Sequence, residues 1–262
     1  MEVSRDAVVF YEHPLNERMR TFLRLEALFT QFDATARGPS PWDSRAALQS
    51  LFEVMRLVGR NELKSELRQE LERYSRTLGR LRQRLPDHVD TQRLDDTLED
   101  LNHLALKVQN FDTIALESLR NNDFLGVIRQ RSALAVGTFD FDLPALHHWL
   151  QYAPDERFQH LQGWFALFLP LREGIETVLH LVRQSAHPTL VQAPQGFYQQ
   201  NLDTNTAYQL LRVSLDTTSS YYPEISGGRH RFAVRFMNQP DPNQKAVPVE
   251  ETVEFGLVCC AL

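Results

Sequence analysis

Cysteine is scarce in this sequence of 262 residues, and its two cysteines, Cys259 and Cys260, are neighbours. Neighbouring cysteines cannot cross-link distant segments, which excludes a fold held together by disulfide bonds. Long apolar stretches are also missing, since the longest, 164–171, is far too short to span a bilayer. The first six residues lack the basic start and apolar core of a signal peptide. We therefore expect a protein of the reducing cytoplasm, without membrane insertion.

Sequence motifs of the common enzyme classes are absent as well. There is no Gly-x-Gly-x-x-Gly, no phosphate-binding Gly-Lys-Ser/Thr loop, no His-Glu-x-x-His and no Gly-x-Ser-x-Gly. We therefore expect no catalytic residues and no cofactor, and we predict that the protein is not an enzyme. The formal net charge of −6 argues against a nucleic-acid partner, because such binders normally carry a positive field.

Two pairs of residues raise the question of a metal site. His147 and His148 are adjacent, and adjacent side chains on a helix point about 100° apart, so they do not converge on one ion. We expect one of them to be buried and the other exposed. Asp140 and Asp142 share one face of an expected strand, where they could hold a cation or act as paired acids. We favour the alternative that they form a solvated face, with Asp142 capping the next helix. We expect no metal.

Apolar residues at spacings of three and four predict a helical body. Asn16 is expected to cap its first helix, with Glu17 in the first turn. The predicted helices cover about 17–32, 48–58, 61–85, 94–108, 113–120, 124–131, 144–149, 155–169 and 171–185.

The chain changes character after Ser185. Runs rich in β-branched and aromatic residues predict strands at 7–11, 137–142, 210–216, 229–237 and 249–260. A strand rarely stands alone, so the N-terminal strand should join the C-terminal ones. We predict an α+β fold, with a helical domain at 17–186 and an antiparallel β domain built from 1–16 and 187–262. The short strand near 137–142 is expected to join the sheet.

The most informative basic residues lie in the predicted strand 229–237. Phe232, Val234 and Phe236 alternate with Arg229, Arg231 and Arg235, so the arginines should stand on the outer face, about 7 Å apart at each step of two residues. Exposed guanidinium groups suit carboxylates, which they bind in a bidentate manner. The alternative is that acids on a neighbouring strand neutralise them; Glu250, Thr252 and Glu254 are the candidate partners.

Further basic residues lie outside this strand. Arg20 and Arg24 are four residues apart on the first predicted helix, where like charges repel unless an anion lies between them. Glu17 or Glu26 would be the usual neutralising partner. Arg129 and Arg131 lie near a helix end, where capping of the helix dipole is the simple explanation. From the charge pattern we add Arg20, Arg229 and Lys245 to a candidate anion-binding surface.

Several runs of the sequence resemble the ZapD family, in the expected order and over nearly the whole chain from Phe10 to Cys260. The matching runs are 12–20 (EHPLNERMR), 128–131 (IRQR), 141–144 (FDLP), Leu146-His147 with Trp149, 196–198 (GFY), 222–226 (YPEIS) and 231–237 (RFAVRFM). One position departs from the family pattern, which has a basic residue shortly before the Ile-Arg-Gln-Arg run, where this chain has Phe124.

The resemblance implies a cell division protein that acts in the cytoplasm at the mid-cell division site. It implies a homodimer that binds the flexible C-terminal tail of FtsZ and cross-links FtsZ filaments into bundles that stabilise the Z-ring. The residues implied for tail recognition are Arg24, His147, Arg231 and Arg235. The alternative from the residues alone is an enzyme or binding module that takes a small anionic ligand on the arginine-lined surface.

Overall fold

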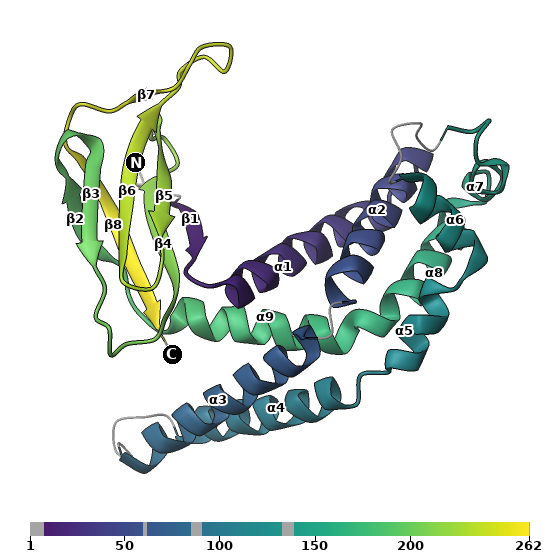
Figure 1. Cartoon of the computed structure of the whole chain (residues 1–262), viewed down its shortest axis with the longest axis horizontal. Coiled ribbons are helices and arrows are strands. Elements are labelled where there is room, and N and C mark those ends of the chain that lie inside the picture. The colour runs from purple at the N-terminus through teal and green to yellow at the C-terminus, as the bar shows by residue number, and fades with distance from the viewer. Residues whose placement is uncertain (1–7, 60–61, 85–90, 133–138, 262) are drawn as a thin grey trace, which may run out of the picture. The chain divides into compact units, whose positions relative to one another are not determined.

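The computed structural model describes residues 8–59, 62–84, 91–132 and 139–261. They adopt the predicted α+β fold, drawn in Figure 1. The chain divides into two compact units. We call Met1–Leu23 with Leu179–Leu262 the sheet unit, and Arg24–Val178 the helical unit.

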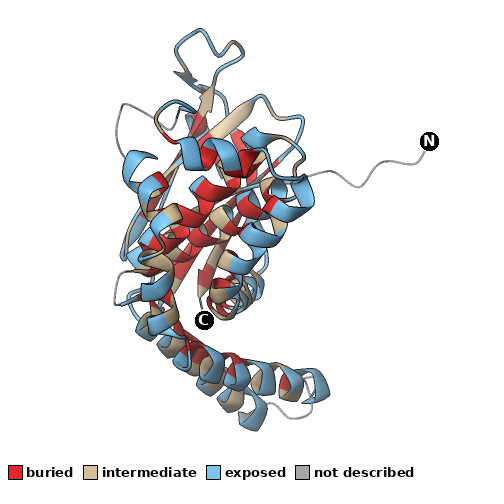
Figure 2. Cartoon of the chain, turned by 90° about the vertical axis from the view of Figure 1, so that its right-hand side faces the viewer, coloured by how far each residue is buried: buried red, intermediate tan, exposed pale blue. Residues whose placement is uncertain are grey.

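The helical unit is built from amphipathic helices whose buried faces form its core. Figure 2 shows this pattern as buried inner faces and exposed outer faces along the helices. The first and last helices contribute residues to both units. The α-helices are α1 (Glu17–Ala36), α2 (Pro41–Val58), α3 (Leu63–Arg84), α4 (Thr91–Gln109), α5 (Thr113–Arg120), α6 (Asp123–Ser132), α7 (Pro144–Leu150), α8 (Pro154–Phe165) and α9 (Leu169–Gln184), with a 3-10 turn η1 (Ala166–Phe168) before the last.

Local sequence signals explain where the first two helices begin. The Asn16 side-chain oxygen accepts a hydrogen bond of 2.9 Å from the Met19 amide, which confirms the predicted cap. The next helix begins at Pro41, earlier than predicted, because Ser40 and Asp43 form a reciprocal capping box. Apolar spacing alone could not locate this start, since the first turn carries the acidic Asp43 and Trp42, which is exposed.

Two four-stranded sheets form the sheet unit. The first has the order β1-β4-β8-β2, and the second has the order β3-β6-β5, with β7 paired to β6. All pairings are antiparallel, and β1 pairs with β4 as predicted for the N-terminal strand. The strands are β1 (Val8–Pro14), β2 (Thr189–Ala193), β3 (Phe197–Asn201), β4 (Tyr208–Asp216), β5 (Tyr221–Gly227), β6 (Arg231–Asn238), β7 (Val247–Pro248) and β8 (Val253–Ala261).

The two sheets pack face to face around one apolar core. Phe236 of β6 contacts Phe255 of β8 with ring centroids 5.0 Å apart, and Tyr198 of β3 meets Phe255 edge-on at 5.5 Å. A tight turn precedes β3, where Gly196 has φ +64°, and an added Cβ there would clash with the Val249 carbonyl oxygen. This position therefore requires glycine.

Three differences from the predicted elements have physical reasons. Phe139–Asp142 is a turn, not part of a strand; the preceding residues 137–138 lie outside the described ranges. The strands β2, β3 and β7 were not predicted because they are short and flanked by proline or glycine. The sequence around Pro223 predicted a turn but forms β5, an edge strand, where the missing amide hydrogen of proline leaves no ladder bond unmade.

Candidate functional site

The outer face of β6 carries the predicted arginines. Phe232, Val234 and Phe236 are buried at 0–1% exposure, while Arg231 and Arg235 are exposed. The period-two prediction is therefore confirmed. Arg229 is also exposed but lies in the bend before β6. At the usual rise per residue, Arg231 and Arg235 are about 13 Å apart along the strand.

The residues next to these arginines come from β3 and β5, the strands that pair with β6 on either side. Arg231 lies opposite Asn201 of β3, and Arg235 lies between Phe197 of β3 and Glu224 of β5. The Arg235 guanidinium carbon is 5.4 Å from the centroid of the Phe197 ring, a cation–π contact that leaves its N–H groups available for a ligand. Among the described residues, no carboxylate forms an ion pair with Arg231 or Arg235.

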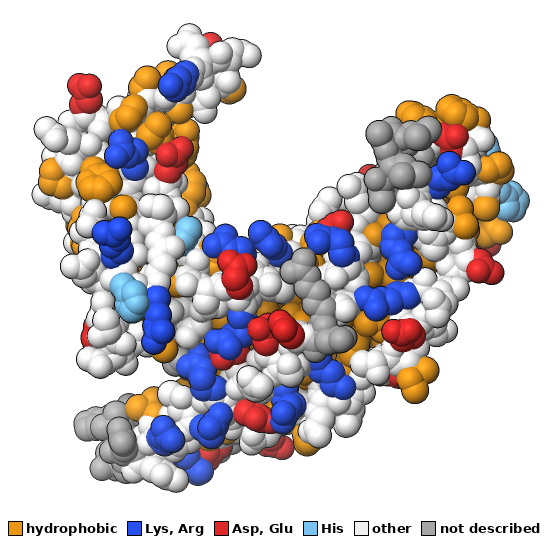
Figure 3. Space-filling model, viewed as in Figure 1, with side chains coloured by type: hydrophobic (Ala, Val, Ile, Leu, Met, Phe, Trp, Pro, Cys, Tyr) orange, Lys and Arg blue, Asp and Glu red, His pale blue; other side chains and the backbone are white. Residues whose placement is uncertain are grey.

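The alternative, neutralisation by Glu250, Thr252 and Glu254, is not observed, because no ion pair among the described residues joins them to these arginines. Glu254 lies on β8, which belongs to the other sheet, where it is opposite Gln192 of β2, while Glu250 and Thr252 lie between β7 and β8. Sequence order could not reveal this, because strands adjacent in sequence need not be adjacent in a sheet. Figure 3 shows Lys and Arg side chains on the face of the sheet unit that carries β5 and β6.

A shallow hollow of about 550 Å³ lies at the end of β6 where the arginines begin. Gln199, Ser226, Gly228, Arg229 and Arg231 contribute to its lining. The guanidinium groups of Arg229 and Arg231 make it a natural place for an anionic group.

The positive charge of Arg20 is felt by His13, which contacts the same end of the second sheet at Gly227. The pKa of His13 is lowered, mainly by burial; its hydrogen bond to the Gly227 backbone opposes this shift, and the positive charge of Arg20 adds to it. The Leu15 side chain also lies beside Gly227. Arg20 pairs with Glu17, with Nε 3.1 Å from Oε1, which confirms the predicted neutralisation for Arg20; no ion pair among the described residues does the same for Arg24.

Lys245 is not brought to this hollow. It is exposed in the loop between β6 and β7, beyond Asn238 at the opposite end of the strand. The seven steps from Arg231 to Asn238 correspond to about 23 Å. A ligand that contacts both the hollow and Lys245 must therefore extend along the whole strand.

The remaining candidates, Arg24 and His147, belong to the helical unit. Arg24 is exposed on α1, and none of the ion pairs among the described residues includes it. His147 and His148 are both exposed, so the expectation that one is buried is wrong. His147 Nδ1 is 3.0 Å from Asp140 Oδ2, and Arg45 Nη2 is 2.7 Å from Asp140 Oδ1.

The structure contradicts the prediction that Asp140 and Asp142 form a solvated face with Asp142 as a helix cap. Asp142 does not cap α7, whose N-cap is Leu143 without a side-chain hydrogen bond. Asp140 is an ion-pair partner and not a merely solvated acid. In the described ranges, no group of three or more His, Cys, Asp or Glu residues is arranged to hold a metal ion. Arg45 was missed in the sequence because its partner lies 95 residues away.

Phe124 occupies an aromatic cluster in the helical unit. Its ring lies 5.8 Å from Trp149 and 5.9 Å from Trp164, and His160 accepts a hydrogen bond of 3.2 Å from Trp149 Nε1. A basic side chain at this position would have to leave the cluster. Nearby, Arg129 donates to the Arg120 carbonyl at 3.3 Å, which fits a structural role at a helix end.

Comparison with known proteins places these features in a family. The ZapD family profile, described as a cell division protein, matches residues 23–235. The chain belongs to the ZapD family. It is 39% identical to a cell division protein ZapD of Methylococcus capsulatus over 97% of this chain and 98% of that protein. The ZapD of Dechloromonas aromatica is 36% identical over 97% of this chain and 100% of its own length, and that of Coxiella burnetii is 34% identical over 97% and 98%.

The ZapD relatives match almost from end to end, so both units belong to the family pattern. The naming of these proteins supports a role in cell division. No helix in the described part of the chain has both the length and the apolar character needed to cross a membrane.

Proposed function

We propose that this protein binds the acidic C-terminal tail of FtsZ and cross-links FtsZ filaments as a homodimer, in the cytoplasm at the division site. The observation that carries the proposal is the exposed pair Arg231 and Arg235 on β6, without an ion-pair partner among the described residues. Guanidinium groups in this state bind peptide carboxylates in the bidentate geometry that lysine cannot reproduce.

Sheet geometry favours an extended peptide as the ligand. The row Arg231, Ala233 and Arg235 lies on one face with Gln199 and Ser226 beside it. A ligand that lies along β6 would meet a positive charge at each end of a segment of about 13 Å. Single-stranded nucleic acid is disfavoured on this face, because Phe232 and Phe236 are buried and cannot stack on bases.

A single tail should bind weakly, since ordering a flexible peptide costs free energy. A filament presents many tails, so avidity makes association firm without a tight individual site. Bundling requires two sites per particle, and a two-fold dimer supplies them. No catalytic step is part of this proposal.

The test is a titration of the purified protein with a labelled synthetic peptide of the FtsZ tail, by fluorescence anisotropy. Arg231→Glu should weaken binding about tenfold or more, because it replaces attraction with repulsion. Arg80→Glu is the matched control, since Arg80 is exposed on α3 in the helical unit. Lys245→Glu should have a smaller effect than Arg231→Glu, because Lys245 lies at the far end of the strand.

Filament pelleting completes the test. Wild-type protein and Arg80→Glu should sediment with FtsZ filaments, and raised salt should weaken this association, as it does for exposed charges. Circular dichroism and sedimentation velocity check that the Arg231→Glu protein keeps its fold and oligomeric state. Unchanged pelleting and peptide binding by Arg231→Glu would show that the binding surface lies elsewhere.

A further inference from the structure

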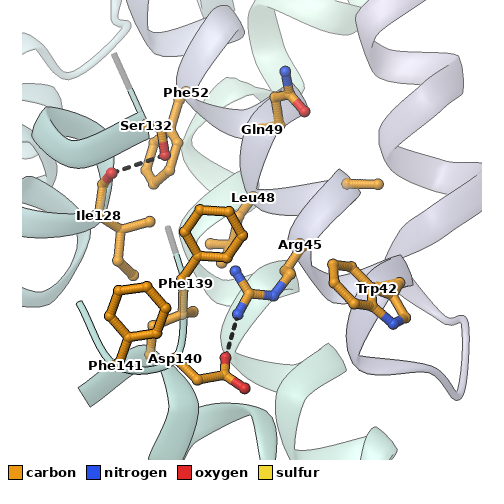
Figure 4. A pocket seen from close by; sticks show the side chains of 12 residues that line it. Trp42, Arg45, Leu48, Gln49, Phe52, Ile128, Ser132, Phe139, Asp140 and Phe141 are labelled. Carbon is orange, nitrogen blue, oxygen red and sulfur yellow. Dashed lines mark hydrogen bonds and ion pairs between the residues drawn. The ribbon is translucent and has the colours of Figure 1, made fainter. Parts of the chain in front are cut away.

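A second candidate surface lies in the helical unit, in the groove shown in Figure 4. The groove has a volume of about 710 Å³ between α2, α6 and the turn at Phe139–Asp142. Its apolar walls include Trp42, Leu48, Phe52, Ile128, Phe139 and Phe141.

Several of these apolar side chains are unusually exposed. Trp42 is 75% exposed, Phe141 81% and Phe139 58%. The rings of Phe139 and Phe141 stack with centroids 5.6 Å apart and an interplanar angle of 5°. Exposed aromatic groups gathered around a groove are typical of an interaction surface.

The polar centre of the groove is one carboxylate held by two basic side chains. Arg45 and His147 contact different oxygens of Asp140, at 2.7 and 3.0 Å. The Arg45 side chain is only 18% exposed, and its guanidinium carbon is 5.5 Å from the Trp42 ring centroid. Asp140 is 57% exposed and comes from the turn. The arginine is therefore the anchored partner, and the carboxylate is the accessible one.

The segment Phe139-Asp140-Phe141 is itself a short acidic and aromatic peptide lying at this groove. Figure 4 shows Asp140 pointing to Arg45, with the two phenylalanine rings beside it. The site thus already accepts a carboxylate flanked by bulky apolar side chains. Because Asp140 itself is 57% exposed, water screens its pair with Arg45 and the pair contributes little to stability, so a ligand carboxylate can replace Asp140 at small cost.

We propose that Arg45 and His147 bind a carboxylate of the acidic tail, that a bulky apolar side chain of the tail packs against Trp42 and Phe141, and that Asp140 is an internal competitor for this place. The inference rests on the proposed function for its choice of partner. The family resemblance already implied His147 for tail recognition, so the new elements are Arg45, the apolar contacts and the competitor Asp140, on a surface separate from the arginine face of β6. In the free protein the site is occupied by Asp140, and tail binding exchanges one carboxylate for another.

The experiment uses the same labelled FtsZ tail peptide and the full-length protein. Asp140→Asn should tighten binding about twofold to fivefold, because it weakens the competitor and preserves its shape. Asp100→Asn is the matched control, since Asp100 is an exposed acid on α4 that does not line the groove. Arg45→Gln should weaken binding about fivefold. Phe141→Ala should also weaken it, and its 81% exposure makes a folding defect unexpected.

The outcomes separate this inference from the proposed function. If Arg231→Glu loses binding while Asp140→Asn, Arg45→Gln and Phe141→Ala all match Asp100→Asn, the inference is overturned and the arginine face stands. If Arg231→Glu binds normally while the groove variants behave as expected, the groove is the tail site and the β6 assignment is wrong. If the wild-type protein does not bind the peptide, both are overturned. If Arg45→Gln fails to fold, Asp140→Asn and Phe141→Ala decide the result.

Discussion

Arg183 of α9 donates two hydrogen bonds to Glu12 of β1, 2.9 Å from Nε to Oε1 and 2.7 Å from Nη2 to Oε2. Arg212 of β4 donates a third, at 2.9 Å, to the same carboxylate. All three side chains are less than about a third exposed. This network joins a helix and two strands within the sheet unit.

Removal of the Glu12 charge should destabilise the sheet unit. Glu12→Gln would leave two half-buried guanidinium groups without their carboxylate, which costs about 2–3 kcal/mol in the free energy of unfolding. Glu17→Gln is the control, because its pair with Arg20 is exposed and contributes little. Urea unfolding followed by circular dichroism measures both. Equal midpoints for the two variants would contradict a structural role of the network.

The Asn16 cap should be worth a measurable amount. Asn16 accepts from the Met19 amide and donates at 2.9 Å to the Gln209 side chain. Asn16→Ala loses both bonds and should cost about 1–2 kcal/mol. Asn16→Asp retains the capping oxygen, so it should cost less. Thermal unfolding of the three proteins gives the order, and an equal loss in both variants would show that capping is not the stabilising interaction.

His13 should make the protein sensitive to acid. Its pKa is lowered in the folded state, chiefly by burial, so the unfolded chain takes up a proton first as pH falls. Stability should therefore decrease as pH drops below about 6.5. His13→Gln should remove part of the slope of unfolding free energy between pH 7 and pH 5. A slope identical to that of the wild type would exclude His13 as its source.

The buried thiol of Cys260 should be unreactive in the native protein. Burial raises the pKa of Cys260 to about 11, so little thiolate is present at pH 8. In a Cys259→Ser background, Ellman's reagent should therefore modify Cys260 slowly until denaturant is added.

The raised pKa of Cys260 also affects stability at high pH, because the unfolded chain loses the thiol proton more readily than the folded protein does. Stability should thus decline as pH rises from about 9 towards 11.

The sequence was informative wherever one local period decided the structure. Alternating Phe232, Val234 and Phe236 placed Arg231 and Arg235 outward, and Asn16 located the start of α1. Local sequence patterns did not predict features that depend on contacts between residues far apart in the sequence. The edge position of β5 accommodates Pro223, and the place of β8 in the other sheet keeps Glu254 from pairing across the ladder with β6.

The helical part of the candidate site shows the same limit. His147 was named by resemblance, but its link through Asp140 to Arg45 joins residues 95 positions apart. The predicted strand at 137–142 came from the alternation of Phe and Asp, yet its described residues, 139–142, form a turn. A pattern of four residues is too short to distinguish a strand from a turn when no neighbouring strand is known.

The uneven distribution of the tryptophans gives this protein two natural optical reporters. Trp149 and Trp164 lie 6.0 Å apart with His160 against them, whereas Trp42 stands 75% exposed at the groove. Emission from the buried Trp149 and the partly buried Trp164 should be shorter in wavelength than that of Trp42, which should emit like an indole in water. Selective excitation at the red edge of tryptophan absorption favours Trp42. A shift of its emission when peptide is added would therefore report binding at the groove, without any label attached to the protein.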